Sequence, residues 1–166
     1  MTLTIAAVNY RAAFLSSDFR LTATATPSAC LPASPKLFQV SRRQLQALVA
    51  YCGLGSIGRV QTNDWLAEQF RSNTNDNLAS TLEQVRANAA SFISHAPSNH
   101  RALTIVLCSV TEGRTFLASI SNHERMDGTL ESARGSFSLE LEYPNQTLVF
   151  VPCGWSRTAS WKRVAG

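Results

Sequence analysis

The stretch LTIAAVNYRAAFL, residues 3–15, decides how the chain begins to fold. Two short apolar runs, residues 3–8 and 12–15, lie on either side of the polar triplet Asn9-Tyr10-Arg11. Such an interruption between two apolar runs is typical of a β-hairpin. The pattern therefore predicts two antiparallel strands that tie the N-terminus into a sheet.

The rest of the chain divides into a strand block, a helix block and a second strand block. Thr, Ala, Ser and Pro dominate residues 22–35 and predict an extended connection, and residues 37–52 predict a second hairpin that ends at glycines. A helix is expected over residues 56–70. Apolar spacings of three and four predict another over residues 76–94, capped by Asn75 or Asp76 and stopped by Pro97. Further strands are expected over residues 103–110, 115–120, 136–143 and 146–151.

The composition indicates one globular domain spanning residues 1–166. Of the 166 residues, 45% are hydrophobic and 16% are charged, which is enough to bury a sizeable core. No apolar run approaches the length of a membrane span, and the first residues lack the features of a secretory signal. We therefore expect a cytoplasmic protein with no membrane association. Four widely separated cysteines indicate neither a disulfide framework nor a zinc site.

The basic charge is scattered along the chain. The formal charge is +4 and the isoelectric point is near 9.2, but only Arg42-Arg43 and Lys162-Arg163 are adjacent basic pairs. Neither pair is interleaved with aromatic residues, so nucleic acid is not an expected partner. The three histidines share no metal-ligand spacing, so neither a metal nor another cofactor is expected.

Four short segments carry the candidate chemistry. They are Thr2 itself, the run from Ser17 to Thr22, the run from Ser34 to Phe38, and the run from Ala50 to Gly55. In this order and at these distances they resemble the β subunits of proteasomes and related bacterial threonine peptidases. After loss of Met1, Asp18 becomes the seventeenth residue, where the resemblance requires an aspartate. The resemblance covers residues 2–70 and continues more loosely over residues 76–94.

This resemblance implies an α+β fold of the N-terminal nucleophile hydrolase type. Such proteins have a four-layer αββα sandwich, in which two β-sheets lie between layers of helices, and commonly stack into rings. Here the sandwich would be shortened at the C-terminus. The strand, helix and strand blocks fit two sheets whose apolar faces are buried by helices. The resemblance also implies a homo-oligomeric ring.

Thr2 is the candidate nucleophile. A threonine hydroxyl needs a nearby base at neutral pH, and a free N-terminal amine has a suitable pKa of roughly 7.7 to 8. Thr2 supplies both groups once Met1 is removed. A buried Lys36 would favour deprotonation of the hydroxyl, and Asp18 would pair with Lys36 and orient it.

Other residues are expected to support this site. The backbone N–H of Gly53 is the candidate donor to the oxyanion, since a residue without a Cβ allows close approach. The resemblance implies that Thr22 lines the substrate cleft and that Arg20 braces the site. It also implies a supporting serine, for which Ser156 is the candidate. The segment Ser119 to Glu124 is interpreted as a strand end and turn.

Two functions remain open at this stage. The first is a threonine-type peptidase or amidohydrolase that acts on a peptide or protein substrate through an ester of Thr2. The second is a catalytically inactive ring or scaffold subunit that retains Met1. A basic adaptor for nucleic acid is a third and weaker alternative, which predicts binding that falls steeply with salt.

Overall fold

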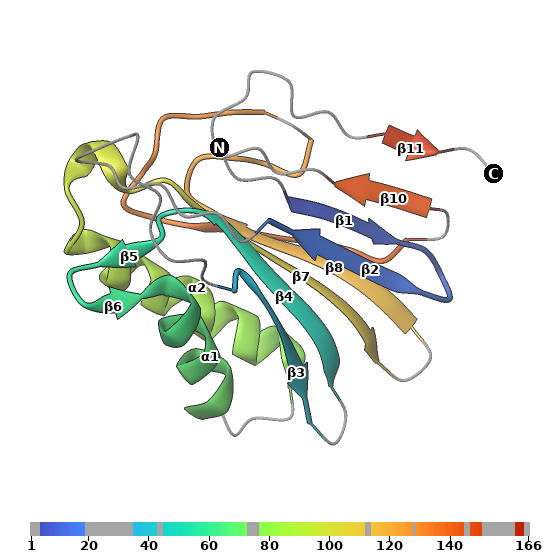
Figure 1. The fold of residues 1–166 in the computed structure, drawn as a ribbon. Coiled ribbons are helices and arrows are strands. Elements are labelled where there is room, and N and C mark those ends of the chain that lie inside the picture. Colours follow the sequence, from blue (N-terminus) through green and yellow to red (C-terminus); the bar gives the residue numbers. More distant parts are fainter. Residues whose placement is uncertain are drawn as a thin grey trace.

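Two antiparallel sheets packed face to face, with two helices on one side, form the described part of the protein (Figure 1). The computed structural model describes residues 4–18, 35–42, 45–72, 77–111, 114–127, 129–144, 147–150 and 162–164. The single-domain prediction stays a prediction, because part of the chain lies outside these ranges. Neither α-helix in the described ranges has the length and apolarity needed to cross a membrane.

The first sheet has four strands in the order β11-β10-β1-β2. These strands are β1 (Thr4–Val8), β2 (Ala13–Ser17), β10 (Thr147–Phe150) and β11 (Lys162–Val164). The predicted N-terminal hairpin is confirmed by the β1–β2 pairing. Its turn forms because the side-chain oxygen of Asn9 accepts the N–H groups of Arg11 and Ala12, at 2.9 and 2.8 Å.

The second sheet has five strands in the order β3-β4-β7-β8-β9. These strands are β3 (Leu37–Ser41), β4 (Gln46–Gly53), β7 (Leu103–Thr111), β8 (Arg114–Ser121) and β9 (Ser138–Glu142). Every neighbouring pair is antiparallel. The second predicted hairpin and the later strand predictions are confirmed, with ends that move by a few residues.

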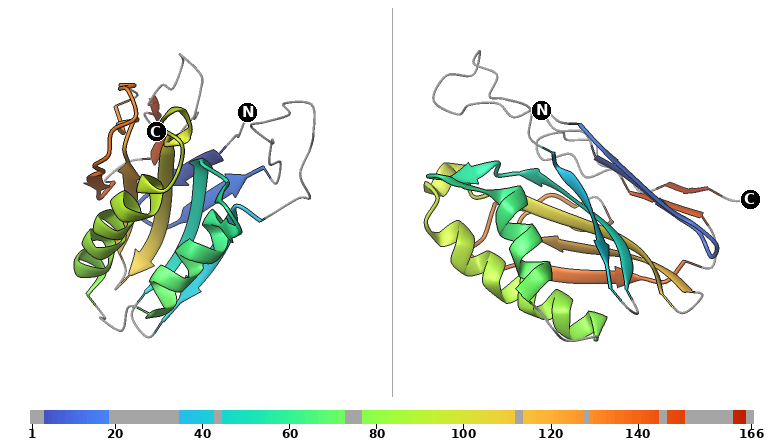
Figure 2. Two further views of the ribbon diagram at one scale, coloured as in Figure 1. Left: turned by 90° about the vertical axis from the view of Figure 1, so that its left-hand side faces the viewer. Right: turned by 60° about the horizontal axis from the view of Figure 1, so that its bottom comes forward.

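Two helices cover the outer face of the five-stranded sheet: α1 (Thr62–Ser72) and α2 (Leu78–Ser94). Figure 2 shows both helices on the same side of that sheet. The α2 prediction is confirmed within two residues. Its N-cap is Asn77, whose side chain accepts the N–H of Ser80, and the capping candidates Asn75 and Asp76 lie outside the described residues. A short 3₁₀ helix (Ser98–His100) follows α2.

The predicted helix over residues 56–70 is wrong in its first six residues. Two short antiparallel strands, β5 (Ser56–Ile57) and β6 (Val60–Gln61), occupy this stretch. The turn between them contains Gly58 with a φ of 57°, a left-handed conformation that glycine adopts without steric cost. The turn at Gly58 prevents the helix from starting at residue 56, and α1 begins at Thr62.

The predicted four-layer αββα sandwich is wrong for this protein. The structure has mostly strands and two α-helices, and both helices lie on the same side of the paired sheets. The described residues therefore form three layers, with no helix on the outer face of the four-stranded sheet. The physical reason lies in the sequence after α2, where the described segments pair into strands instead of forming outer helices.

Two apolar layers hold these elements together. One lies between the five-stranded sheet and the helices and includes Val49, Ile105 and Leu82. The other lies between the two sheets and includes Val8 and Val106. Burial of each such side chain stabilises the fold by roughly 1.5 to 3 kcal/mol. The candidate site lies in the second layer, because this layer is apolar along only part of its length and polar along the rest.

Candidate functional site

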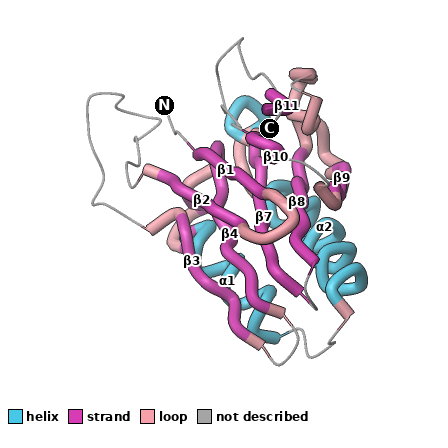
Figure 3. The backbone as a smooth tube through the Cα atoms, turned by 90° about the vertical axis from the view of Figure 1, so that its right-hand side faces the viewer, coloured by secondary structure: helices cyan, strands magenta, loops and turns pink. Residues whose placement is uncertain are grey.

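The space between the two sheets changes from apolar to polar toward one end. Side chains on a strand alternate between its two faces, so Thr104 lies on the same face of β7 as the inter-sheet residue Val106. Ser119 and Ser121 share a face of β8 with Leu117 in the same way. Strand β1 packs against β7 and β8, and β2 packs against β4 and β7 (Figure 3). Buried hydroxyl and charged groups therefore gather at the end of the inter-sheet space.

A buried ion pair joins the two sheets at this end. The ammonium nitrogen of Lys36 lies 2.9 Å from a carboxylate oxygen of Asp18. The Lys36 side chain is only 2% exposed, whereas that of Asp18 is 31% exposed. Asp18 follows β2 of the first sheet, and Lys36 precedes β3 of the second. The sequence prediction that these two residues meet in a confined place agrees with this geometry.

A hydroxyl contact joins the start of β1 to the end of β2 beside this ion pair. Thr4 lies opposite Ser17 in the hairpin, and their hydroxyl oxygens are 3.0 Å apart. Thr4 is completely buried.

Gly53 ends β4 close to Lys36. The backbone N–H of Tyr51, two residues earlier, donates to the carbonyl oxygen of Lys36 at 3.2 Å. Gly53 has a φ of 97°, and a Cβ built on it would lie 2.1 Å from the carbonyl oxygen of Ala102. Only glycine fits this position, both for its backbone conformation and for the close approach of a neighbouring strand. The assignment of its N–H to the oxyanion stays a prediction.

The remaining residues of the predicted site are not described by the structure. Thr2, Arg20, Thr22 and Ser156 all lie outside the described ranges. The described geometry therefore brings together Asp18 and Lys36, with Gly53 on the adjacent strand.

The structure adds a buried carboxylate that the sequence analysis missed. Glu124 is 2% exposed, and the hydroxyl of Thr104 donates to one of its carboxylate oxygens at 3.4 Å. Thr104 also lies 2.8 Å from the hydroxyl of Ser121. The segment around Glu124 does form a strand end and turn, as predicted, but it also points an acidic group inward. No local sequence pattern indicates that Glu124 contacts Thr104, because the two residues are far apart in sequence. The pairing of β7 with β8 brings them together.

A buried histidine adjoins this carboxylate. The side-chain oxygen of Asn122 accepts the N–H of Leu103, while its amide nitrogen donates to the carbonyls of Arg101 and Arg134. This network fixes the amide orientation of Asn122, so its oxygen, 3.3 Å from Nδ1 of His123, can only accept. Nδ1 therefore carries the hydrogen, and Nε2 is an acceptor. Nε2 is buried, and no hydrogen-bond partner for it is found in the part of the chain that the structure describes.

Burial also determines the charge state of this histidine. Loss of solvation lowers the pKa of His123 below its ordinary value of 6.5, because the charged imidazolium is disfavoured in a low-dielectric environment. The ring is therefore neutral at neutral pH.

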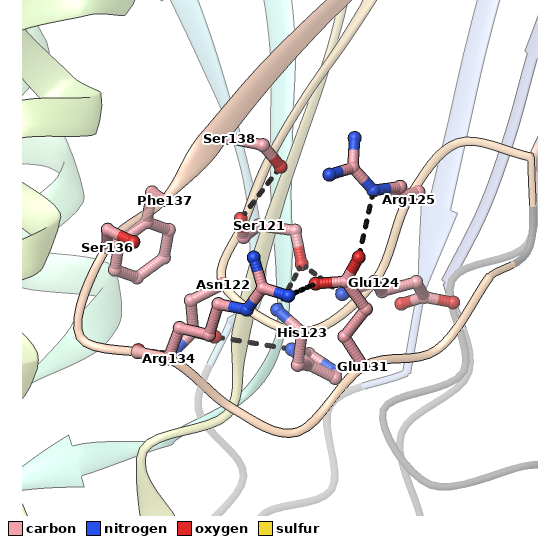
Figure 4. Close-up of a pocket in the computed structure, with 10 residues that line it drawn as sticks. All are labelled: Ser121, Asn122, His123, Glu124, Arg125, Glu131, Arg134, Ser136, Phe137 and Ser138. Carbon is pink, nitrogen blue, oxygen red and sulfur yellow. Dashed lines mark hydrogen bonds and ion pairs between the residues drawn. The ribbon is translucent and has the colours of Figure 1, made fainter.

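Figure 4 shows the polar pocket to which His123 and Glu124 belong. The pocket encloses about 140 Å³. Glu131 lies between two arginines: one carboxylate oxygen is 3.2 Å from Nε of Arg125, and the other is 2.7 Å from Nη2 of Arg134. These charges neutralise one another at the rim, whereas Glu124 lies deeper. Among the described residues, no group of three or more His, Cys, Asp or Glu side chains could hold a metal ion.

Comparisons with known proteins identify no family for this chain. No family model matches the sequence, and neither the curated proteins nor the solved structures contain a significant match.

Proposed function

We propose that the protein is a hydrolase of the threonine type, in which Thr2, exposed by loss of Met1, attacks an acyl group of a peptide or protein substrate. The observation that carries the proposal is the buried Lys36–Asp18 ion pair beside the start of β1. The assembly expected from the resemblance, a homo-oligomeric ring, belongs to the same proposal.

A buried lysine of this kind suits activation of a hydroxyl. Burial of an ammonium group costs several kcal/mol unless a partner compensates it. Asp18 supplies such a partner at the position where Lys36 is buried. A fixed positive charge stabilises an alkoxide that forms next to it and lowers the pKa of a neighbouring amine. Both effects favour a threonine that uses its own amine as base.

The proposed reaction proceeds in two stages. The Thr2 oxygen bonds to the acyl carbon while its proton passes to the Thr2 amine. The tetrahedral intermediate then collapses: the carbon–nitrogen bond breaks, and the departing amine takes the proton from the Thr2 ammonium. Water next attacks the carbon of the resulting ester and gives a proton to the Thr2 amine. The bond between this carbon and the Thr2 oxygen then breaks, the oxygen takes the proton back from the ammonium, and a carboxylic acid is released. The N–H of Gly53 would donate to the oxyanion in both stages.

Peptide hydrolysis by Thr2 variants tests this proposal. The wild-type protein should cleave members of a fluorogenic peptide library, and Thr2→Ala should reduce the rate at least about a hundredfold, because the nucleophile is lost. Thr2→Ser is the matched control, since it keeps the hydroxyl and the amine and should retain measurable activity. Alanine and serine are both small, so neither should prevent removal of Met1. Equal rates for wild type and Thr2→Ala would refute the proposal.

A further inference from the structure

We propose that mild acid separates the two limbs of the connection between β8 and β9, and that protonation of the buried His123 causes this change. The first limb comprises residues 122–125 and the second residues 129–134. The inference goes beyond the proposed function and does not depend on Thr2.

Hydrogen bonds hold the two limbs together. The N–H of Arg134 donates to the carbonyl oxygen of Asn122 at 3.0 Å, and the N–H of Glu131 donates to that of His123 at 2.7 Å. The side-chain amide of Asn122 donates to the carbonyl oxygens of Arg134 and Arg101, each at 2.8 Å. The position of the second limb therefore depends on that of Asn122 and His123.

His123 has no place for a second ring hydrogen while the limbs are closed. The residue is only 7% exposed, and its Nδ1 hydrogen is donated to the side-chain oxygen of Asn122. A proton taken up from solvent therefore goes to Nε2, which has no hydrogen-bond partner among the described residues. A charged and unsatisfied N–H group is costly to bury, so the ring must leave the interior to be protonated.

Movement of this ring disturbs the contacts between the limbs. Figure 4 shows Glu131 and Arg134 of the second limb beside His123. The ring is bonded to Asn122, and the carbonyl oxygens of Asn122 and His123 are the acceptors for the second limb. Exposure of the ring therefore weakens both backbone hydrogen bonds.

The charged groups around His123 do not offset the cost of charging it. The carboxylate of Glu131 is engaged by two arginines, and the guanidinium group of Arg101 bonds to carbonyl oxygens at the end of α2. No described carboxylate lies within hydrogen-bond distance of Nε2. The charged residues of the two limbs, of the start of β7 and of β9 are Glu124, Arg125, Glu131, Arg134, Arg101 and Glu140.

The direction of the pH effect follows from this burial. Burial lowers the pKa of His123 in the closed form, whereas an exposed histidine has a pKa near 6.5. Below pH 6.5 the open form binds more protons, so acid favours opening. Between about pH 7.5 and about pH 5.5 the opening equilibrium should rise by up to about tenfold. The pocket of Figure 4 is lined by residues 121–125, 131, 134 and 136–138, so its shape should change with pH.

Amide hydrogen exchange of the whole protein tests the inference. NMR resolves single amides, and each rate is divided by the intrinsic rate at the same pH. The protection of the Glu131 and Arg134 amides should fall about five- to tenfold from about pH 7.5 to about pH 5.5. At both pH values it should also be at least about tenfold lower than that of Leu107, because β7 is the central strand of its sheet and opens with the whole fold.

Two histidine variants identify the group responsible. In His123→Gln the protection of the Glu131 and Arg134 amides should become independent of pH over this range, because no group at position 123 then takes up a proton. The matched control His95→Gln removes an exposed histidine after α2 and should keep the wild-type dependence.

Three results would overturn the inference. The first is protection of Glu131 and Arg134 that does not change with pH in wild type. The second is protection equal to that of Leu107 at both pH values, which would mean that the limbs separate only when the protein unfolds. The third is an undiminished pH dependence in folded His123→Gln. If His123→Gln does not fold, the first two comparisons, which need only the wild-type protein, decide the outcome.

Discussion

The ammonium of Lys36 lies 2.9 Å from the carboxylate of Asp18, and this ion pair connects the two sheets at the polar end of their shared space. Replacement of Asp18 by Asn should lower the free energy of unfolding by about 1.5 to 3 kcal/mol, because it removes a charged hydrogen-bond partner of the buried ammonium. Urea unfolding measures this loss.

The exposed pair Arg71–Glu68 on α1 provides the control for this variant. Glu68→Gln removes a carboxylate in the same chemical way but at the surface, where ion pairs contribute little. Its unfolding midpoint should stay close to that of wild type. Equal and small effects of the two substitutions would show that the Lys36–Asp18 pair is not a buried interaction in solution.

Gly53 should tolerate no side chain. In Gly53→Ala the new Cβ would lie 2.1 Å from the carbonyl oxygen of Ala102, and the left-handed backbone would also be strained. We expect a loss of more than about 2 kcal/mol in unfolding free energy. Gly58→Ala is the matched control, since Gly58 also has a positive φ but no atom lies within 4 Å of its added Cβ. That variant should lose only about 1 to 2 kcal/mol, and a larger loss than in Gly53→Ala would contradict the account.

His123 should make the protein less stable in mild acid. Burial lowers the pKa of His123 below 6.5, so the unfolded chain takes up a proton first as the pH falls below that value. Stability is therefore complete above pH 6.5 and decreases below it, by at most about 1.4 kcal/mol per pH unit. Thermal unfolding at about pH 7.5 and about pH 5.5 measures the loss.

The variant His123→Gln should lose less stability between these two pH values than wild type does, whatever its stability at neutral pH. His95→Gln, at an exposed position after α2, serves as the control and should show the wild-type dependence. An identical pH dependence in all three proteins would mean that His123 is not held neutral by burial.

Cys108 should be unreactive in the folded protein. Burial raises the pKa of the Cys108 thiol to about 12, because the thiolate would be poorly solvated between the sheets. Iodoacetamide at about pH 8 should therefore leave Cys108 unmodified in native protein and modify it after unfolding. Peptide mass spectrometry assigns the label, and rapid modification of native Cys108 would argue against the described packing.

Much of the fold was predictable because its signals are local. The first hairpin consists of two short apolar runs separated by turn residues such as Asn9, the second has a similar pattern, and α2 has a regular apolar stripe. The β5–β6 turn was missed because a single residue, Gly58, overrides a weak helical pattern. The layer arrangement was missed for a different reason. It depends on how the later strands pair, and sheet pairing is decided by tertiary contacts.

The site was only partly predictable. The family resemblance predicts the pairing of Lys36 with Asp18, whereas no local pattern relates residues 18 positions apart in sequence. The local sequence around Glu124 indicates only a turn, because its hydroxyl partner Thr104 comes from another strand. Buried polar groups that meet across strands become visible only when the register of the sheet is known.

The most direct test of the central claim is the intact mass of the native protein before and after treatment with a peptidyl epoxyketone. The account predicts a mass that lacks Met1 and, after treatment, one adduct located on Thr2 by peptide sequencing. Lys36→Met should keep the processed N-terminus but form the adduct far more slowly. A native protein that retains Met1, or an adduct located elsewhere, would contradict the claim that Thr2 is a nucleophile activated beside Lys36.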